Sequence, residues 1–185
     1  AAQLPKGKSF SAAYRVKGLE EDKVFSEVAR KTGLKKKLSD SAFSIVNYAF
    51  SEMLNNAIDH SKASRVRIEI KFVHGSLEFQ IRDKGVGTFE SVRKKFKLKD
   101  HLEAAEHVLK GKQTTAPIHH SGQGIFFTSR IADRFALESR KLKLDVNNEI
   151  KDMGLVDIPW VQGTRVIFRV KQKSKKNLKA LFNEY

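Results

Sequence analysis

The sequence predicts an α+β fold, a two-layer sandwich in which helices pack on a sheet. Segments 65–73 and 76–82 alternate apolar and polar residues on either side of His74-Gly75, which is typical of a β-hairpin. Segment 41–60 instead repeats its apolar residues at helical spacing. Because helices and strands do not alternate regularly along the chain, a doubly wound parallel sheet is less favoured.

The composition is that of a globular domain. The chain has 185 residues, enough for one domain with a real core, and 40% of them are hydrophobic. No apolar run approaches the roughly 20 residues that a membrane span needs. The chain contains no cysteine, which excludes disulfides and thiolate metal sites and allows a reducing compartment. We therefore expect a cytoplasmic location and no membrane association.

The charge balance is strongly basic. Lysine and arginine number 36 against 21 acidic residues, which gives a formal net charge of +15. This balance favours an anionic partner, namely a nucleotide, a nucleic acid or an acidic protein surface. The alternative is a solvated basic surface. The lysines are dispersed, and the sequence carries no recognition-helix or zinc-finger signature, so direct nucleic-acid binding is the less favoured hypothesis.

The elements before the hairpin are predicted as follows. Residues 1–12 are small, polar and basic, as in a linker or the edge of a longer chain, and 13–17 are a short strand. Residues 20–32 have helical periodicity that ends at Gly33. Ser39 or Ser41 caps the long helix over 41–60.

The elements after the hairpin are less regular. The highly charged segment 88–111 is predicted to be helical, and the irregular, polar segment 112–121 suits a mobile lid. Residues 124–134 are predicted to form a buried helix. Further strands are expected at 135–141, around 142–146 and at 164–170, and a short helix at 177–182. These elements divide the chain into a linker at 1–12, one domain at 13–172 and a basic tail or short helix at 173–185.

The long helix carries a polar flank beside its apolar face. Glu52, Asn56 and His60 follow one another at i, i+4 and i+8. The carbonyl oxygen of Asn56 suits Mg²⁺, a cation that usually shares its oxygen ligands with substrate phosphates. Glu52, one turn earlier, could orient or deprotonate a nucleophile. The alternatives are a solvated pair for Glu52 and Asn56, and for His60 either the pocket rim or a cation at the helix end.

Two glycine motifs complete the candidate site. In Asp83-Lys84-Gly85-Val86-Gly87, the carboxylate that ends the hairpin can accept the exocyclic amine of adenine, and the glycines allow the backbone to approach the base or ribose. Gly122 and Gly124 open a helix whose exposed amides and dipole favour phosphate. This second motif is neither a Walker A loop nor a dinucleotide fingerprint. Together with the long helix, the two motifs indicate a nucleotide pocket.

The three motifs, in this order and spacing, resemble those of the GHKL ATPases, the superfamily of gyrase and the histidine kinases. Glu52-x-x-x-Asn56 is similar to the N box, Asp83-x-Gly85-x-Gly87 to the G1 box, and Gly122-x-Gly124 to the G2 box. Gly163-Thr164 resembles the closing element whose threonine helps to hold adenine. The resemblance spans about residues 13–171. It implies a Bergerat fold: a mixed sheet with helices on one face, and ATP between the helices and a helical lid.

The resemblance also implies roles for individual residues. Asn56 would bind Mg²⁺, Asp83 adenine, and Gly85 and Gly87 would allow close backbone approach. Gly122 and Gly124 would face the phosphates, Thr164 would lie near the adenine, and Glu52 would be the general base. Residues of the lid would close over the γ-phosphate, namely Lys112, Thr114 and Thr115.

Within the superfamily, Glu52-x-x-x-Asn56-Ala57-x-x-His60 is most similar to the anti-sigma-factor serine kinases. The stretches 111–115 and 120–130 resemble bacterial ATP-binding regulators often linked to STAS-like domains. These resemblances leave three classes of function open: a kinase acting on a partner protein, an ATP-dependent switch with slow hydrolysis or none, and a basic DNA-associated module that uses the fold without catalysis.

Overall fold

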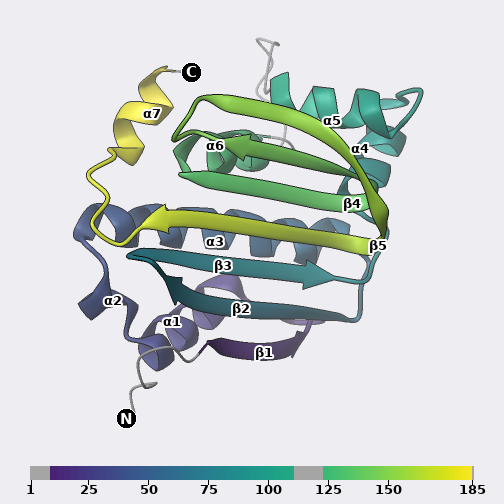
Figure 1. The fold of residues 1–185 in the computed structure, drawn as a ribbon. Coiled ribbons are helices and arrows are strands. Elements are labelled where there is room, and N and C mark those ends of the chain that lie inside the picture. The colour runs from purple at the N-terminus through teal and green to yellow at the C-terminus, as the bar shows by residue number, and fades with distance from the viewer. Residues whose placement is uncertain (1–8, 111–122, 185) are drawn as a thin grey trace.

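The computed structural model describes residues 9–110 and 123–184, and it forms one sheet covered by helices (Figure 1). The five strands of the described chain lie in the order β1-β2-β3-β5-β4. Their bounds are Phe10–Arg15 for β1, Arg65–Val73 for β2, Ser76–Asp83 for β3, Arg134–Asn147 for β4 and Asp152–Lys171 for β5. The predicted α+β two-layer sandwich is confirmed.

The sheet differs from the expected mixed sheet because its four pairings of neighbouring strands are all antiparallel. The reason is the position of β5, which pairs antiparallel with β3 on one side and with β4 on the other. The strands β3 and β4 therefore run in the same direction, as a crossover through helices requires, without being hydrogen-bonded neighbours.

The helices gather on one face of the sheet, as Figure 1 shows. Their bounds are Glu21–Thr32 for α1, Leu34–Lys37 for α2, Asp40–His60 for α3, Thr88–Phe96 for α4, His101–Lys110 for α5, Gln123–Ile131 for α6 and Leu178–Glu184 for α7. As predicted, α1 ends at Gly33, which adopts a left-handed conformation with φ 69°. Ser39 is the residue that caps α3, because its side chain accepts a hydrogen bond from the amide of Ala42.

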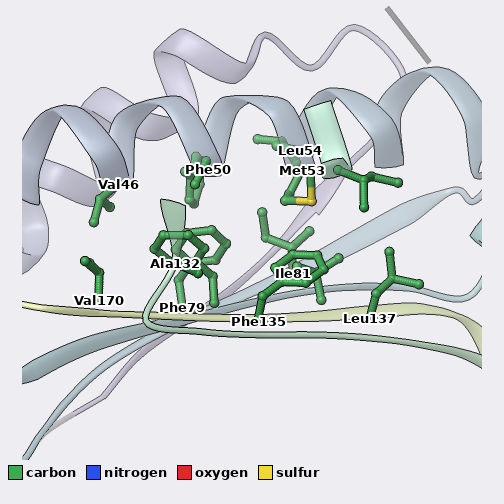
Figure 2. Close-up of a cluster of buried hydrophobic side chains, with 14 of the residues drawn as sticks. Val46, Phe50, Met53, Leu54, Phe79, Ile81, Ala132, Phe135, Leu137 and Val170 are labelled. Carbon is green, nitrogen blue, oxygen red and sulfur yellow. The ribbon is translucent and has the colours of Figure 1, made fainter. Parts of the chain in front are cut away.

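The core lies between α3 and the sheet (Figure 2). Val46, Phe50, Met53 and Leu54 of α3 are buried and face Phe79, Ile81, Phe135, Leu137 and Val170 of the strands. The rings of Phe79 and Phe168, which are paired across β3 and β5, stack with their centroids 4.8 Å apart. The predicted apolar face of the long helix is therefore the contact that joins the two layers.

The β4–β5 hairpin is longer than predicted. Two strands were expected over 135–146, but β4 is a single strand with register shifts around Arg140. β5 begins at Asp152 rather than at Thr164. The hairpin folds back on itself. As a result, the backbone amide of Asn148 at its tip donates a hydrogen bond to the carbonyl oxygen of Asp133, just before β4 begins. Pro159 and the irregular spacing of apolar residues before Gly163 hide this strand from a periodicity argument.

The loop at residues 84–87, here called the glycine loop, joins β3 to α4. The charged segment after it forms two helices rather than one. The helix α4 ends at Phe96 and is followed by Lys97, which adopts a left-handed conformation with φ 55°, and α5 begins at His101. Lysine carries no local signal for this conformation, so the break is not apparent in the sequence. The predicted lid at 112–121 lies outside the described residues. Within the described ranges, no helix is long and apolar enough to cross a membrane.

Candidate functional site

A pocket opens between α3, the sheet and α4. Asn56 and His60 of α3, Asp83 at the end of β3 and Thr164 of β5 all line it. Apolar side chains make up much of the remaining wall, namely Met53, Ala57, Ile81, Val92, Phe96, Ile125, Leu137 and Val166. A concave, mostly apolar site with a few convergent polar groups is the usual form of a small-molecule site.

Asp83 is held at the base of this pocket by backbone groups. Its side chain is buried, with 4% of the residue exposed, and Oδ1 accepts a hydrogen bond of 2.8 Å from the amide of Gly85. Burial raises the pKa of Asp83, and hydrogen bonds from the backbone of Gly85 and Thr164 oppose that effect. The carboxylate is thus fixed in one orientation before any ligand arrives.

Gly85 lies against the end of α3. A Cβ atom at this position would overlap the carbonyl oxygen of Ser61, the residue that follows the helix. The same carbonyl accepts a hydrogen bond of 2.7 Å from the amide of Val86. The glycine loop is therefore fastened to the helix that carries Asn56, and the contact requires a residue without a side chain.

Gly87 and Gly163 meet on the other side of the loop. Both have positive φ, 91° and 71° respectively. A Cβ on Gly87 would overlap the hydroxyl of Ser139, and a Cβ on Gly163 would overlap the carbonyl oxygen of Asp83. Both glycines are therefore required by conformation and by close approach, which accounts for two of the glycines in the predicted motifs.

Thr164 joins β5 to the start of α4. Its Oγ1 accepts a hydrogen bond of 2.9 Å from the amide of Thr88 and lies 3.0 Å from the Thr88 hydroxyl. Thr164 is also paired with Asp83 across the two strands. Hydrogen bonds therefore link the predicted motif residues Asp83, Gly85 and Thr164, and Gly87 directly precedes Thr88, which donates to Thr164.

Asn56 is half-buried and lines the pocket from α3. Its Nδ2 atom is buried and has no hydrogen-bond partner among the described residues. A buried polar atom without a partner costs free energy and calls for an explanation, which a ligand that enters the pocket would supply. Rotation of the amide by 180° would present Oδ1 in place of Nδ2, so the group can face either a donor or a cation.

Glu52 and Gly124 come together where α3 meets α6. A Cβ at Gly124 would overlap Oε2 of Glu52. Gly124 is buried in the first turn of α6, and Glu52 is half-buried one turn before Asn56. The structure therefore brings a carboxylate to the amino end of the helix that was predicted to face phosphate.

The other predicted residues divide into two groups. His60 is exposed and lines the pocket, so it lies at the rim as well as at the carboxyl end of α3. Lys112, Thr114, Thr115 and Gly122 lie outside the described residues, and their roles stay predictions. Within 9–110 and 123–184, no group of three or more histidine, cysteine or acidic residues is arranged to hold a metal ion.

Three side chains that contact the backbone near Asp83 and the glycine loop were not identified from the sequence. Ser139 donates to the carbonyl oxygen of Gly163 at 2.8 Å, and Arg140 Nη2 donates to that of Val86 at 2.8 Å. Gln162 Nε2 donates to the carbonyl oxygens of Lys84 and Gly85. All three belong to the bend of the β4–β5 hairpin and contact the glycine loop. Only Gln162, beside Gly163, carried a turn signal that could have drawn attention to it.

The pocket thus gathers a carboxylate and a threonine from neighbouring strands, the glycine loop and the side-chain amide of Asn56. The family model of the histidine kinase-like ATPase domain matches residues 21–147, most of the chain. The chain therefore belongs to the family of histidine kinase-like ATPase domains, and ATP binding is the activity that this membership supports. Among curated proteins, no sequence matches the chain.

Proposed function

We propose that this domain binds ATP with Mg²⁺ and acts on a partner protein, either as a serine kinase or as an ATP-dependent switch. Family membership supports ATP binding. The observation that carries the proposal is the buried Asp83 carboxylate, which is fixed by backbone amides in the same pocket as Asn56, whose Nδ2 atom has no hydrogen-bond partner among the described residues. The pocket thus offers a fixed acceptor and, within the part of the chain that the structure describes, a buried polar atom without a partner.

Each group in the pocket has a proposed task. Asp83 accepts a hydrogen bond from the exocyclic amine of adenine, and Thr164 orients the start of α4 beside the base. The apolar wall encloses the ring. The amide groups at the start of α6 face the phosphates, since a helix amino end favours anions. Gly124 allows this end to approach Glu52 closely.

The residues present fit a Mg²⁺ ion that is shared with phosphates rather than held by protein alone. Asn56 would hold the ion through its side-chain oxygen, and bound Mg²⁺ would supply charge neutralisation for the phosphates. Glu52, one helical turn away, would take a proton from the attacking hydroxyl of a serine or of water. The resemblance to anti-sigma-factor kinases makes a STAS-like domain the proposed partner, and a bacterial cytoplasm the proposed location.

The basic surface supports a second candidate, a DNA-associated module. The observation in its favour is the net charge of +15. If DNA were the ligand, its affinity would fall steeply with salt, because binding releases counterions. Weak binding that a physiological salt concentration abolishes, alongside salt-tolerant ATP binding, would favour the nucleotide over DNA.

The chemistry is tested by Glu52→Gln. We expect this variant to bind ATP like the wild type and to lose turnover by roughly 10²–10⁴, the contribution of a general base. Calorimetric titration with ATP and Mg²⁺ measures the binding. Single-turnover measurements on the full-length protein, with candidate partner domains present, measure phosphoryl transfer and hydrolysis separately.

Glu106→Gln is the matched control, because Glu106 is exposed on α5. It should bind and turn over ATP like the wild type. Equal, measurable turnover by the wild type and Glu52→Gln would show that Glu52 is not the base. If neither protein turns over ATP while both bind it, the switch replaces the kinase. If the wild type does not bind ATP, the proposed function is wrong.

A further inference from the structure

The carboxyl end of α6 is held by a side chain from the distant tip of the β4–β5 hairpin. The last carbonyl groups of a helix lack partners within the helix. Here Asn148 Nδ2 lies 2.7 Å from the carbonyl oxygen of Ser129, 3.1 Å from that of Arg130 and 2.9 Å from that of Ala132. One amide group therefore spans three of the carbonyl groups at the helix end.

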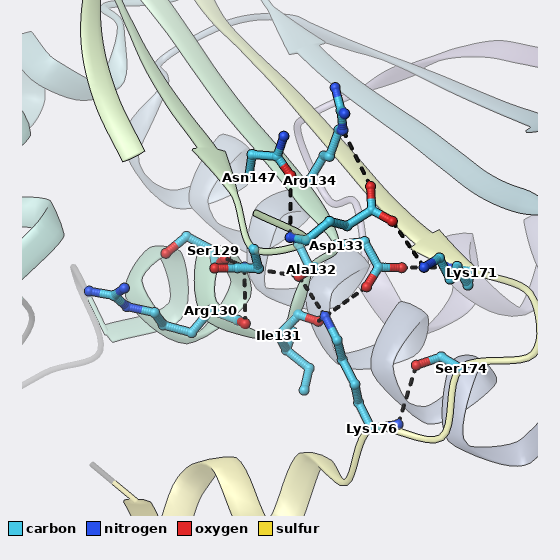
Figure 3. A network of polar contacts seen from close by, with 12 residues as sticks. Ser129, Arg130, Ile131, Ala132, Asp133, Arg134, Asn147, Lys171, Ser174 and Lys176 are labelled. Atoms are coloured by element: carbon cyan, nitrogen blue, oxygen red, sulfur yellow. Dashed lines mark hydrogen bonds and ion pairs between the residues drawn. The ribbon is translucent and has the colours of Figure 1, made fainter. Parts of the chain in front are cut away.

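A second side chain reaches the same end from the segment after β5. Lys176 Nζ donates to the carbonyl oxygens of Ile131 and Ala132, at 3.0 and 2.7 Å, and lies 2.8 Å from Oδ1 of Asp133 (Figure 3). The other carboxylate oxygen of Asp133 accepts from the amide of Lys171. A cation at a helix carboxyl end is stabilised by the dipole, and here two-thirds of the Lys176 side chain is shielded from solvent.

The same C-terminal segment also bridges α6 and α3. The ring of Phe182, in α7, lies 5.0 Å from the ring of Phe127 in α6 and 5.1 Å from that of Tyr48 in α3. Tyr48 lies one helical turn before Glu52, the side chain against which Gly124 packs. The C-terminal segment thus contacts both of the helices that meet at the proposed phosphate end.

We propose that residues 174–184 position α6, and that Lys176 is the principal positioning residue. The helix has nine residues and spans about 13 Å, so a shift at its carboxyl end is transmitted to its amino end. This inference rests on the proposed function, because the amino end of α6 is the part assigned to the phosphates. The C-terminal segment therefore sets the affinity for the phosphates without touching the nucleotide.

The test compares nucleotides that differ only in their phosphates. Lys176→Met keeps the apolar stem of the side chain but removes the cation. We expect its affinity for ADP and ATP to fall roughly three- to tenfold, the size of a partly buried helix-dipole interaction. Its affinity for adenosine, which reaches only the end at Asp83, should stay unchanged. Lys175→Met is the matched control, since Lys175 is the exposed neighbour, and it should bind all three ligands like the wild type.

Hydrogen exchange in the ligand-free protein gives a readout that does not depend on nucleotide binding. We expect amides of α6 to exchange faster in Lys176→Met than in Lys175→Met. Phe182→Leu, which weakens the bridge to Tyr48 and Phe127, should act in the same direction and replaces Lys176→Met if that variant does not fold.

The outcomes separate the two proposals. An equal loss of affinity for adenosine and ATP, or no loss for either, would overturn the positioning role. Wild-type protein that binds neither adenosine nor ATP would overturn the proposed function, and the exchange of α6 would then decide the positioning role alone. Unchanged exchange of the α6 amides in both Lys176→Met and Phe182→Leu would overturn the positioning role.

Discussion

The two ends of the pocket are built in different ways. At the end of Asp83, backbone amides and threonine hydroxyls fix the polar side chains, and Gly85 is packed against the carbonyl of Ser61. On the α3 side, the functional groups are side chains: Glu52 packs against Gly124 in the first turn of α6, and Asn56 Nδ2 has no hydrogen-bond partner within the described residues. The polar side chains beside Asp83 therefore have hydrogen-bond partners without a ligand, whereas Nδ2 of Asn56 has none among the described residues.

This contrast predicts which property a substitution at each end should change, stability or ligand affinity. Substitutions among tightly packed backbone groups affect the free energy of unfolding, because neighbouring backbone must move. Substitution of a side chain that makes no such contacts affects the affinity for the ligand instead, because the unliganded protein loses little. The following changes test this difference, from the largest expected effect to the smallest.

Gly85→Ala should have the largest effect, and it should be on stability. The new Cβ would overlap the carbonyl group of Ser61, so either the glycine loop or the end of α3 must move. We expect the free energy of unfolding to fall by about 2–4 kcal/mol, as for severe overpacking. Chemical denaturation of the ligand-free protein measures this loss.

Gly154→Ala is the matched control for that variant. Gly154 lies in β5, where a Cβ would meet nothing within 4 Å among the described residues. Its stability should stay within about 0.5 kcal/mol of the wild type, as for other surface changes. Equal stabilities of the two variants would contradict the close packing of the loop on α3.

Asp83→Asn should have an intermediate effect, on affinity. The amide can accept only through one oxygen, so it cannot satisfy both the backbone and the adenine amine as the carboxylate does. We expect ATP binding to weaken by roughly 1–3 kcal/mol. Calorimetric titration measures the change, and Asp157→Asn, at an exposed position of β5, is the control. If Asp83→Asn binds ATP like the wild type, the assignment of this end to adenine is wrong.

Asn56→Ala should have the smallest effect, and only in the presence of metal. The variant removes a buried Nδ2 atom that has no hydrogen-bond partner in 9–110 or 123–184, so the free energy of unfolding should hardly change. ATP affinity should lose its Mg²⁺ dependence, with a decrease of roughly 0.5–1.5 kcal/mol when the ion is present. Titrations with and without Mg²⁺ measure this, with Asn55→Ala as control. An unchanged Mg²⁺ dependence would argue against Asn56 as the metal ligand.

Much of the fold could be predicted where a single periodicity determines the structure. The β2–β3 hairpin and α3 follow their sequence patterns within a residue or two, because one face of each is buried in the core. The β4–β5 hairpin could not be predicted, since its bend depends on Arg140 in a left-handed conformation and its tip on Asn148, which caps α6. Neither the left-handed backbone of Arg140 nor the contact of Asn148 with α6 has a local signal in the sequence.

The site divides in the same way. Asp83 and the glycines at 85, 87 and 163 could be identified, because a close approach or a positive φ restricts those positions to few residue types. Arg140 and Ser139 could not, because any polar residue is acceptable in an isolated strand. Their contacts with the glycine loop arise only when the hairpin folds over it.

The bend of the hairpin has a consequence for observing the protein. Trp160, the single tryptophan in the sequence, is half-exposed, and its ring lies 4.7 Å from the guanidinium of Arg140. Arg140 in turn donates to the carbonyl oxygen of Val86, between the two glycines of the loop. A cation over an indole ring changes the emission of that ring. We therefore expect the emission of Trp160 to report on the glycine loop without an added label, since this sequence has no second tryptophan to obscure the signal.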